Sequence, residues 1–371
     1  MNETQERPGY LLLEDGRRFE GRYLGPPEGT AGEVVFTTVM TGYQETLTDP
    51  SFAGQVVVMT APMMGVYGVR SADEQSRRPW VAGFVIRHLS HRAGDGPSEG
   101  SLRTYLLEHR IPTLVEADTR AITRHIREAG AMRAVLLHDG VPEAEARARL
   151  QAEPSMRGRD LATEVSTPAP YELGAEGEER GLVLCLDYGV KSRSLELIRR
   201  AGYRVRVLPC ATPAEALVEA QPDGVFVSNG PGDPEAVPGA VSRILAVSDA
   251  GVPVFGICLG HQLVARAFGG ENYKLPYGHR GGNHPVKNLE SGAVEITSQN
   301  HGFAVREEEG EIVSAPELAI THRNLNDGTV EGLVHRERPV FAVQYHPESA
   351  PGPHDSRYLF ERFVAAMAGS T

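Results

Sequence analysis

The feature that most constrains the fold is a regular alternation of apolar strands and amphipathic helices from residue 181 onward. GLVLCLD is followed by the helical pattern SLELIRRAG, and YRVRVLP by PAEALVEAQ. The alternation continues through GVFVSNG, GAVSRILAVSDAG, VPVFGI and a helix that begins LGHQLVARAFGG. This pattern predicts an α/β fold with a doubly wound, mostly parallel sheet that has helices on both faces. Ligand sites in such sheets lie outside the carboxyl ends of the strands.

Residues 1–150 have a different pattern, which predicts a smaller β-rich domain of mixed α/β structure. LLLEDGRRFEGRYLG is typical of a hairpin that turns at Asp15-Gly16, and GEVVFTT, QVVVMT and WVAGFVI are typical of strands. Helices are expected from Asp118 to Gly130 and over PEAEARARL. Residues 151–180 are rich in Pro, Gly and charge, which indicates an interdomain linker. The chain is therefore predicted as domain 1–150, linker 151–180 and domain 181–371.

Composition narrows the class of protein. The chain has 371 residues and a formal net charge of -12, which argues against a nucleic-acid-binding protein because phosphate contacts need clustered Lys and Arg. Its three cysteines are too few and too far apart for a disulfide framework, which fits a reducing compartment. The N-terminus MNETQERPGY lacks a secretory signal, and no apolar run is long enough for a membrane span. We therefore expect a cytoplasmic protein without membrane contact.

The segment that points most directly to chemistry is Gly256-Ile257-Cys258-Leu259-Gly260, between a strand and a helix. Its spacing matches the nucleophile elbow G-x-S-x-G, with Cys in place of Ser. A sharp turn leaves no room for side chains beside the nucleophile, and the helix N-terminus favours a thiolate and a developing oxyanion. The alternative is an inert cysteine buried in a strand–helix corner. The flanking glycines favour a nucleophile.

A thiol nucleophile needs a base, and His346 is the candidate because it ends the apolar strand VFAVQY. At that position its ring can reach the crevice that holds the elbow. Glu348 can accept the second ring N–H and fix the tautomer. The alternative is a surface histidine in a proline turn. The elbow upstream favours the base.

Two further segments consist of turn-forming residues. SNGPGDP (228–234) follows a strand, and its glycines would allow backbone to approach a ligand closely; the alternative is a structural turn. SQNHGF (298–303) follows the strand candidate VEITS. The histidines at 279, 284 and 301 match no familiar zinc spacing, so no metal site is expected.

These segments, in the order SNGPGDP, GICLGHQ and HPE, resemble the class I (triad-type) glutamine amidotransferases. Further segments look like the small subunit family of carbamoyl phosphate synthetase: LDYGVK (186–191), GHRGGNHPV (278–286), SQNHGFAV (298–305), HPESAPGPHD (346–355) and GEVVFTTVMTGYQETLTDPSFAGQ (32–55). The last segment separates this family from other amidotransferases. The resemblance covers nearly the whole chain except the two termini and residues 151–180.

The resemblance implies that Cys258 attacks the carboxamide carbon of L-glutamine, that a thioester forms, and that ammonia leaves. His346, oriented by Glu348, would then activate the water that releases glutamate. It also implies these glutamine-binding positions: Ser51, Gly230, Gly232, Leu259, Gln262, Asn300, Gly302 and Phe303. Ser51 would come from the N-terminal domain and place the substrate at the domain interface. Backbone N–H groups of Leu259 and of the 230–232 loop would hold the oxyanion.

The resemblance further implies a large synthetase subunit as partner, which would take up the ammonia and make carbamoyl phosphate for arginine and pyrimidine synthesis. ATP, bicarbonate and metal ions would bind that subunit, and this chain would need no cofactor. Two alternatives remain. One is a cysteine hydrolase, such as a γ-glutamyl peptidase, on a similar fold; the other is a subunit that kept the fold and lost activity. The 32–55 segment and GGNHPV argue against the first, and the presence of all three catalytic residues argues against the second.

Overall fold

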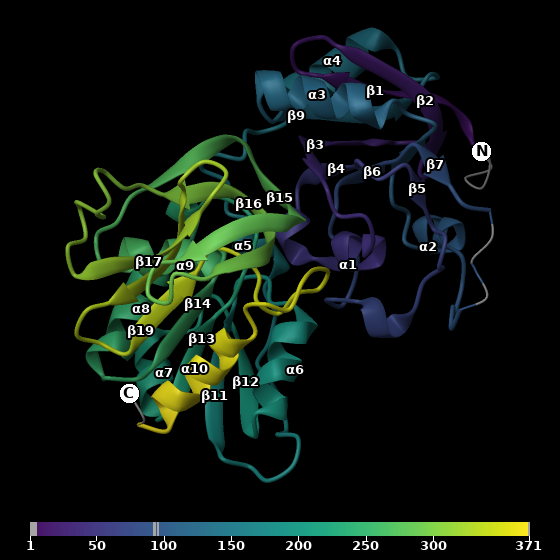
Figure 1. Cartoon of the computed structure of the whole chain (residues 1–371). Coiled ribbons are helices and arrows are strands. Elements are labelled where there is room, and N and C mark those ends of the chain that lie inside the picture. Colours follow the sequence, from purple (N-terminus) through teal and green to yellow (C-terminus); the bar gives the residue numbers. More distant parts are fainter. Residues whose placement is uncertain (1–5, 92–93, 95, 370–371) are drawn as a thin grey trace. The chain divides into compact units, whose positions relative to one another are not determined.

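The computed structural model describes residues 6–91, 94 and 96–369, so the first five residues of the polar N-terminus lie outside it. The chain divides into two compact units (Figure 1). The first contains the chain up to Arg159 together with Pro276–Arg280, and the second contains Asp160–Leu275 and Gly281–Thr371. The inclusion of Pro276–Arg280 in the first unit has no counterpart in the domain bounds expected from sequence.

The first unit is a closed barrel in which the strands follow the order β1-β2-β8-β6-β4-β3-β9. Its strands are β1 (Arg7–Leu13), β2 (Arg18–Leu24), β3 (Thr30–Thr37), β4 (Gln55–Met59), β6 (Gly83–Val85), β8 (Thr113–Val115) and β9 (Met132–His138), with a separate pair β5 (Met63–Met64) and β7 (His88–Leu89). Its helices are α1 (Tyr43–Thr48), α2 (Leu102–Glu108), α3 (Thr119–Ala129) and α4 (Glu143–Ala152), with short 3-10 turns at Pro50–Phe52 and Ser71–Asp73. The hairpin predicted at Asp15-Gly16 is confirmed by the antiparallel pairing of β1 with β2.

Successive side chains of the barrel strands point alternately into and out of the barrel. Leu11 and Leu13 of β1 belong to the apolar cluster inside the barrel (the interior cluster), whereas Tyr10 and Leu12 pack outside it against α4. Helix α3 adds Ile122 and Ile126 to the interior cluster. The helix predicted from Asp118 to Gly130 is confirmed, because the Asp118 side chain caps it through the backbone N–H of Ala121 at 3.0 Å.

The second unit contains a ten-stranded sheet in the order β10-β12-β11-β13-β14-β19-β18-β17-β15-β16. Its strands are β10 (Tyr171–Leu173), β11 (Gly181–Asp187), β12 (Tyr203–Pro209), β13 (Gly224–Val227), β14 (Val254–Ile257), β15 (Asn272–Asn288), β16 (Val294–Val305), β17 (Leu318–Asn324), β18 (Val330–His335) and β19 (Val340–Val343). Its helices are α5 (Ala162–Val165), α6 (Ser192–Arg200), α7 (Ala214–Glu219), α8 (Ala240–Asp249), α9 (Leu259–Ala267) and α10 (Tyr358–Met367), with a 3-10 turn at Pro234–Ala236.

The sheet is parallel only in its centre, where β12, β11, β13, β14 and β19 pair in parallel. Antiparallel strands extend it on both sides: β10 pairs with β12, and β18 with β19. The expectation of a mostly parallel sheet therefore holds for the central strands and not for the antiparallel strands on either side of them. The polar composition of β15 and β17 conceals these strands in the sequence.

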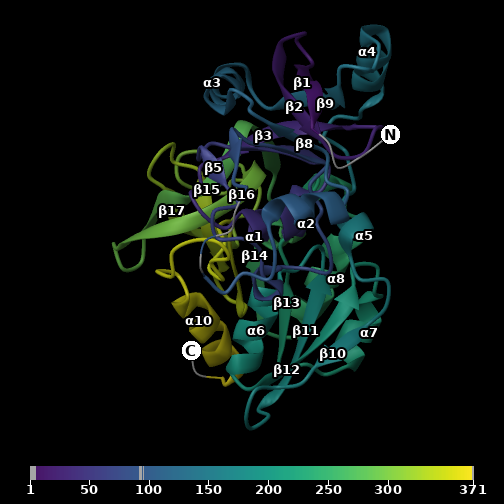
Figure 2. The same cartoon turned by 90° about the vertical axis from the view of Figure 1, so that its right-hand side faces the viewer.

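The two faces of this sheet carry separate cores, as a doubly wound arrangement requires. Figure 2 shows helices on both sides of the sheet. Leu182, Leu184 and Leu186 of β11 point to the face covered by α7, α8 and α9, whereas Val183 and Cys185 point to the face covered by α6 and α10. Near-continuous apolar runs such as GLVLCLD are the pattern of a strand buried on both faces.

The segment predicted as a linker, residues 151–180, contains regular structure. Helix α5 lies within it, and β10 joins the edge of the sheet by pairing with β12. Residues 171–173 form a short edge strand whose apolar pattern is too weak to be seen in the sequence among its charged neighbours. Within residues 6–91, 94 and 96–369, none of the helices has the length and apolar character of a membrane span.

Candidate active site

Cys258 lies at the junction between β14 and α9, where it forms the N-cap of the helix. Its backbone has φ 56° and ψ -104°, a conformation that residues with a side chain rarely adopt. The backbone N–H of Cys258 donates to Val343 O at 2.9 Å, and its thiol lies 3.6 Å from Asn300 O. The residue is 2 % exposed. The strained turn fixes the sulfur at the carboxyl end of β14, as a nucleophile elbow does.

The glycines around Cys258 have a steric cause. A Cβ at Gly260 would lie 2.1 Å from Val227 O, and one at Gly256 would lie 2.8 Å from Gly260 O. Gly230 in the neighbouring loop is under the same constraint, because its Cβ would lie 2.0 Å from Tyr188 O. The backbone segments around the elbow therefore pack too closely for any side chain at these positions.

His346 follows β19 closely and is anchored by its backbone N–H, which donates to Ser298 O at 2.9 Å. Its ring Nδ1 lies 2.7 Å from Glu348 Oε1. With Nδ1 engaged by the carboxylate, the second ring nitrogen is available for a reacting group. That Nε2 is buried and makes no hydrogen bond of standard geometry within the described chain. Cys258 nevertheless lies close enough to raise the pKa of the ring.

Glu348 is fully buried and has a second charged partner. Lys191 Nζ also lies 2.7 Å from Glu348 Oε1, and it donates to Ala350 O at 2.9 Å. Lys191 comes just after β11 and forms the N-cap of α6. No role was predicted for it, although it lies within the LDYGVK segment. A buried lysine cannot be distinguished from an exposed one in a sequence, because the distant carboxylate that pairs with it is not visible there.

The buried charges act on one another. Burial lowers the pKa of the His346 ring, but the Glu348 carboxylate and Cys258 outweigh burial and the opposing charge of Lys191, and raise it to about 10. Burial raises the pKa of Glu348, but Lys191 and His346 hold it below its usual range. At neutral pH the histidine is therefore protonated and the glutamate ionised. A protonated ring beside the cysteine can serve as an acid toward a leaving group.

Apart from Ser51, the other residues predicted from the resemblance fall into three places of the second unit. Leu259 and Gln262 lie in α9; Asn300, Gly302 and Phe303 lie in β16; Gly230 and Gly232 lie in the loop after β13. The Gln262 amide donates to Phe303 O at 2.9 Å and to Gln344 Oε1 at 3.0 Å. The backbone oxygen of Asn300 lies 3.6 Å from the sulfur of Cys258.

Ser51 lies in the first unit, in the short turn Pro50–Phe52. It is buried, and its backbone N–H donates to Asp49 Oδ1 at 2.9 Å. Its expected place beside glutamine stays a prediction.

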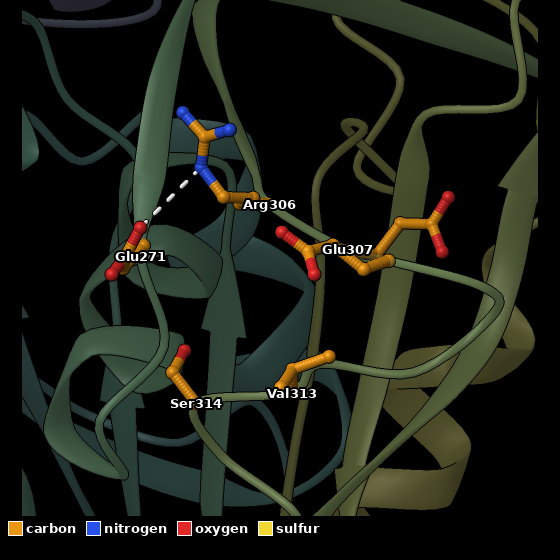
Figure 3. A pocket seen from close by; sticks show the side chains of 6 residues that line it. Glu271, Arg306, Glu307, Val313 and Ser314 are labelled. Atoms are coloured by element: carbon orange, nitrogen blue, oxygen red, sulfur yellow. Dashed lines mark ion pairs between the residues drawn. The ribbon is translucent and has the colours of Figure 1, made fainter.

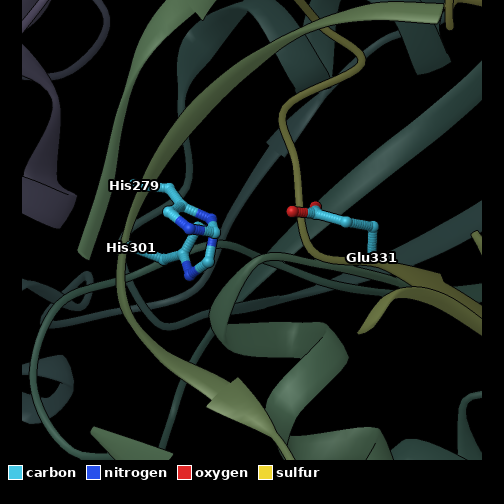
Figure 4. Close-up of side chains that lie close together, drawn as sticks. All are labelled: His279, His301 and Glu331. Atoms are coloured by element: carbon cyan, nitrogen blue, oxygen red, sulfur yellow. The ribbon is translucent and has the colours of Figure 1, made fainter. Parts of the chain in front are cut away.

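Among the histidines considered for a metal, His301 has protein partners within the second unit. Figure 4 shows His301 and Glu331 from that unit. The His301 ring contacts Phe303 O at 2.7 Å and Gln299 Oε1 at 2.9 Å. Glu331 accepts from Gln299 at 3.0 Å and from Asn324 at 2.8 Å. These contacts account for both side chains as parts of a buried polar network. The expectation of no metal stays a prediction.

A shallow hollow of about 150 Å³ lies elsewhere on the second unit (Figure 3). Glu271 and Arg306 form an ion pair of 3.4 Å at its edge, and Glu307, Glu308, Val313 and Ser314 complete the lining. None of the residues predicted for the site lines this hollow.

Comparison with known proteins matches both units. Residues 184–366 match the family model "Glutamine amidotransferase class-I", and residues 11–136 match "Carbamoyl-phosphate synthase small chain, CPSase domain". A carbamoyl phosphate synthase small chain from Symbiobacterium thermophilum is 47% identical over 360 residues, which cover 96% of this chain and 97% of that protein. One from Chlorobaculum tepidum is 47% identical over 98% of each chain. One from Thermus thermophilus is 46% identical over 97% of this chain and 94% of that protein.

Proposed function

This chain belongs to the carbamoyl phosphate synthase small chain family, and we propose that Cys258, His346 and Glu348 are the residues with which it hydrolyses the side-chain amide of L-glutamine. The observation that carries this proposal is the buried pair of His346 and Glu348 beside a cysteine in a strained strand–helix turn. A nucleophile, a base and a group that orients the base are the parts that acyl transfer requires.

The proposed reaction begins with the Cys258 thiolate. Its sulfur attacks the carboxamide carbon of glutamine, and the carbonyl electrons move to the oxygen. His346 then gives its ring proton to the amide nitrogen, the carbon–nitrogen bond breaks, and ammonia leaves a γ-glutamyl thioester. The neutral ring next takes a proton from water, and the resulting hydroxide attacks the thioester carbon. The carbon–sulfur bond breaks, which restores the thiolate and the protonated histidine, and the new carboxylic acid releases its proton to solvent as glutamate leaves.

Backbone N–H groups would stabilise the negative oxygen. Leu259 is the first residue of α9, and N–H groups in the first turn of a helix have no partner within the helix. The loop that contains Gly230 and Gly232 lies close to the elbow, as the approach of Gly260 to Val227 O and of Gly230 to the Leu259 side chain indicates. We assign the oxyanion hole to these two backbone segments.

We assign glutamine binding to side chains and backbone on both sides of the elbow. The proposed set is Ser51, Gly230, Gly232, Leu259, Gln262, Asn300, Gly302 and Phe303. Support for the residues of the second unit comes from the placement of Asn300 O against the thiol and of Phe303 O against Gln262. Ser51 is proposed from the resemblance alone.

The ammonia would pass to a large synthetase subunit, which would bind ATP, bicarbonate and metal ions and make carbamoyl phosphate for arginine and pyrimidine synthesis. This chain itself would need no cofactor. The names of the relatives, each a small chain of a synthase, support the partner.

The test is Cys258→Ser in the complex with the large subunit. Glutamine hydrolysis should fall by several powers of ten, because losses of a nucleophile are of that size. Synthesis of carbamoyl phosphate from added ammonia should remain, because glutamine supplies only the nitrogen. Near-normal hydrolysis by the variant would refute the nucleophile, and a wild-type chain that hydrolyses glutamine at full rate and binds no large subunit would instead indicate a stand-alone hydrolase.

A further inference from the structure

Helix α3 presents three arginines on one exposed face. Arg120, Arg124 and Arg127 are spaced four and three residues apart, which places them in one stripe along the helix, and all three are exposed. They line a hollow of about 370 Å³ together with Thr60 and Thr123. We call these three residues the arginine face. At 1.5 Å per residue the stripe is about 10 Å long.

The arginine face has unused hydrogen-bonding capacity. Across the described residues, none of the three guanidinium groups forms a hydrogen bond or an ion pair. The two threonine hydroxyls do not compete as donors, because Thr60 donates to Thr37 O at 3.0 Å and Thr123 to Thr119 O at 2.7 Å. Arginine side chains are therefore the only free donors known to line this hollow among the residues that are described.

The neighbouring helix α4 shows the usual arrangement for comparison. There Arg147 pairs with Glu143 and Arg149 pairs with Glu145, each four residues apart. The one acidic residue within α3, Glu128, follows Arg124 by four residues without pairing to it. Like charges on successive turns repel each other and destabilise a helix slightly. Arg127 in the last turn favours the helix dipole, whereas Arg120 in the first turn opposes it. The stability of the helix therefore does not explain the stripe as a whole in a chain with a net charge of -12.

The opposite face of α3 already accounts for its packing. Ile122 and Ile126 are fully buried in the interior cluster of the barrel, and Asp118 and Gly130 cap the two ends of the helix. The arginine face is therefore free to contact another molecule without loss of the fold.

We propose that the arginine face docks the large synthetase subunit by pairing with carboxylates on that subunit. This inference rests on the proposed function, which supplies the partner. A guanidinium presents two parallel N–H donors that match a carboxylate, so three of them in a stripe fit an acidic protein segment about 10 Å long. Complementary charges of this kind speed association and fix the register of the two surfaces.

Two other anions fit the arginine face less well. A single phosphate would leave part of a stripe about 10 Å long without a partner, and no buried donor is known to line the hollow in the described chain. A nucleic acid would meet an acidic protein, and none of the lining residues is aromatic, so bases would have no side chain to stack on. An acidic protein surface remains as the occupant.

The experiment compares the affinity of the full chain for the large subunit before and after the change Arg120→Glu, Arg124→Glu and Arg127→Glu together. We expect the dissociation constant to rise at least about tenfold, with most of the change in the association rate, and its dependence on salt to weaken. Glutamine hydrolysis by the isolated variant and its thermal unfolding should match those of the unaltered chain. The single variants should each produce part of the effect.

The control carries the same change in net charge at exposed arginines elsewhere: Arg147→Glu, Arg157→Glu and Arg336→Glu. It should bind the large subunit nearly as tightly as the unaltered chain. Equal affinity of the α3 variant and the unaltered chain would overturn the proposed docking face while leaving the proposed function intact. An equal loss of affinity in the control would also overturn the proposed docking face, because the change in net charge alone would then explain the effect. Failure of the unaltered chain to bind any large subunit would overturn both.

Discussion

Lys191 Nζ lies 2.7 Å from Glu348 Oε1, and both side chains are buried. The same oxygen contacts the Nδ1 of His346, so the carboxylate accepts from two cationic groups at once. Removal of two charges from water is costly, and the attraction between them offsets that cost only while both partners are present. Lys191 therefore keeps Glu348 ionised inside the protein, and an ionised Glu348 holds the histidine ring in place.

We expect Lys191→Met to lower the free energy of unfolding by about 3 to 5 kcal/mol, because it leaves a buried carboxylate with one partner fewer. Denaturant unfolding measures this change. Arg147→Met is the matched control: it breaks the exposed pair with Glu143 and should cost less than about 1 kcal/mol. A loss at Lys191 no larger than at Arg147 would show that the buried pair adds nothing to stability.

Glu348→Gln should reduce glutamine hydrolysis less than His346→Asn does, because the glutamate only orients the ring whereas the histidine transfers protons. We expect at least about a tenfold difference between the two variants in kcat, although residues that act as a unit do not contribute additively. Steady-state kinetics with glutamine measure it. Equal losses would mean that Glu348 takes a direct part in proton transfer.

The pKa shifts predict how stability depends on pH. The pKa of His346 is raised from 6.5 to about 10, so its contribution is complete below about pH 6.5 and is lost as the pH rises toward 10. The pKa of Glu348 is lowered from 4.5, so its contribution is present above that value and is lost as the pH falls below it. Unfolding free energy measured across this range should decrease on both sides. His346→Asn should flatten the alkaline side; an unchanged alkaline slope would rule out the histidine as its source.

An electrophile that mimics glutamine should label Cys258 and spare Cys185. Burial and the nearby Asp187 raise the pKa of the Cys185 thiol well above its usual value, so this residue stays a thiol. Cys210 is buried as well, and its sulfur lies 3.7 Å from the Thr163 hydroxyl. Peptide mapping after labelling locates the adduct. Cys258→Ser is the control and should take up almost no label; preferential modification of Cys185 in the folded chain would contradict the assignment.

The elbow and the central strands could be predicted from the sequence because local rules determine them. Gly256 and Gly260 flank Cys258 at the spacing that a sharp turn requires, and GLVLCLD is apolar throughout because both of its faces are buried. His346 and Glu348 could be predicted for a similar reason, because they are only two residues apart and directly follow the apolar strand VFAVQY.

What could not be predicted depends on long-range contacts. Lys191 is 157 residues from Glu348 in sequence, by subtraction of their numbers, and nothing near either residue indicates the pair. The closure of the barrel by β1 and β9 joins strands more than a hundred residues apart. Residues Pro276–Arg280 belong to the first unit although the flanking parts of β15 belong to the second, because Pro276 O accepts from Ala131 N.

The raised pKa of the His346 ring has a consequence for the timing of proton movement. Since the ring already carries a proton at neutral pH, it takes none from the thiol as sulfur attacks glutamine in the proposed reaction. The first proton transfer would then be the one from the His346 ring to the departing nitrogen. Thioester formation measured in heavy water should then slow only in the step that expels ammonia, whereas a thiol that had to ionise during attack would delay the earlier step.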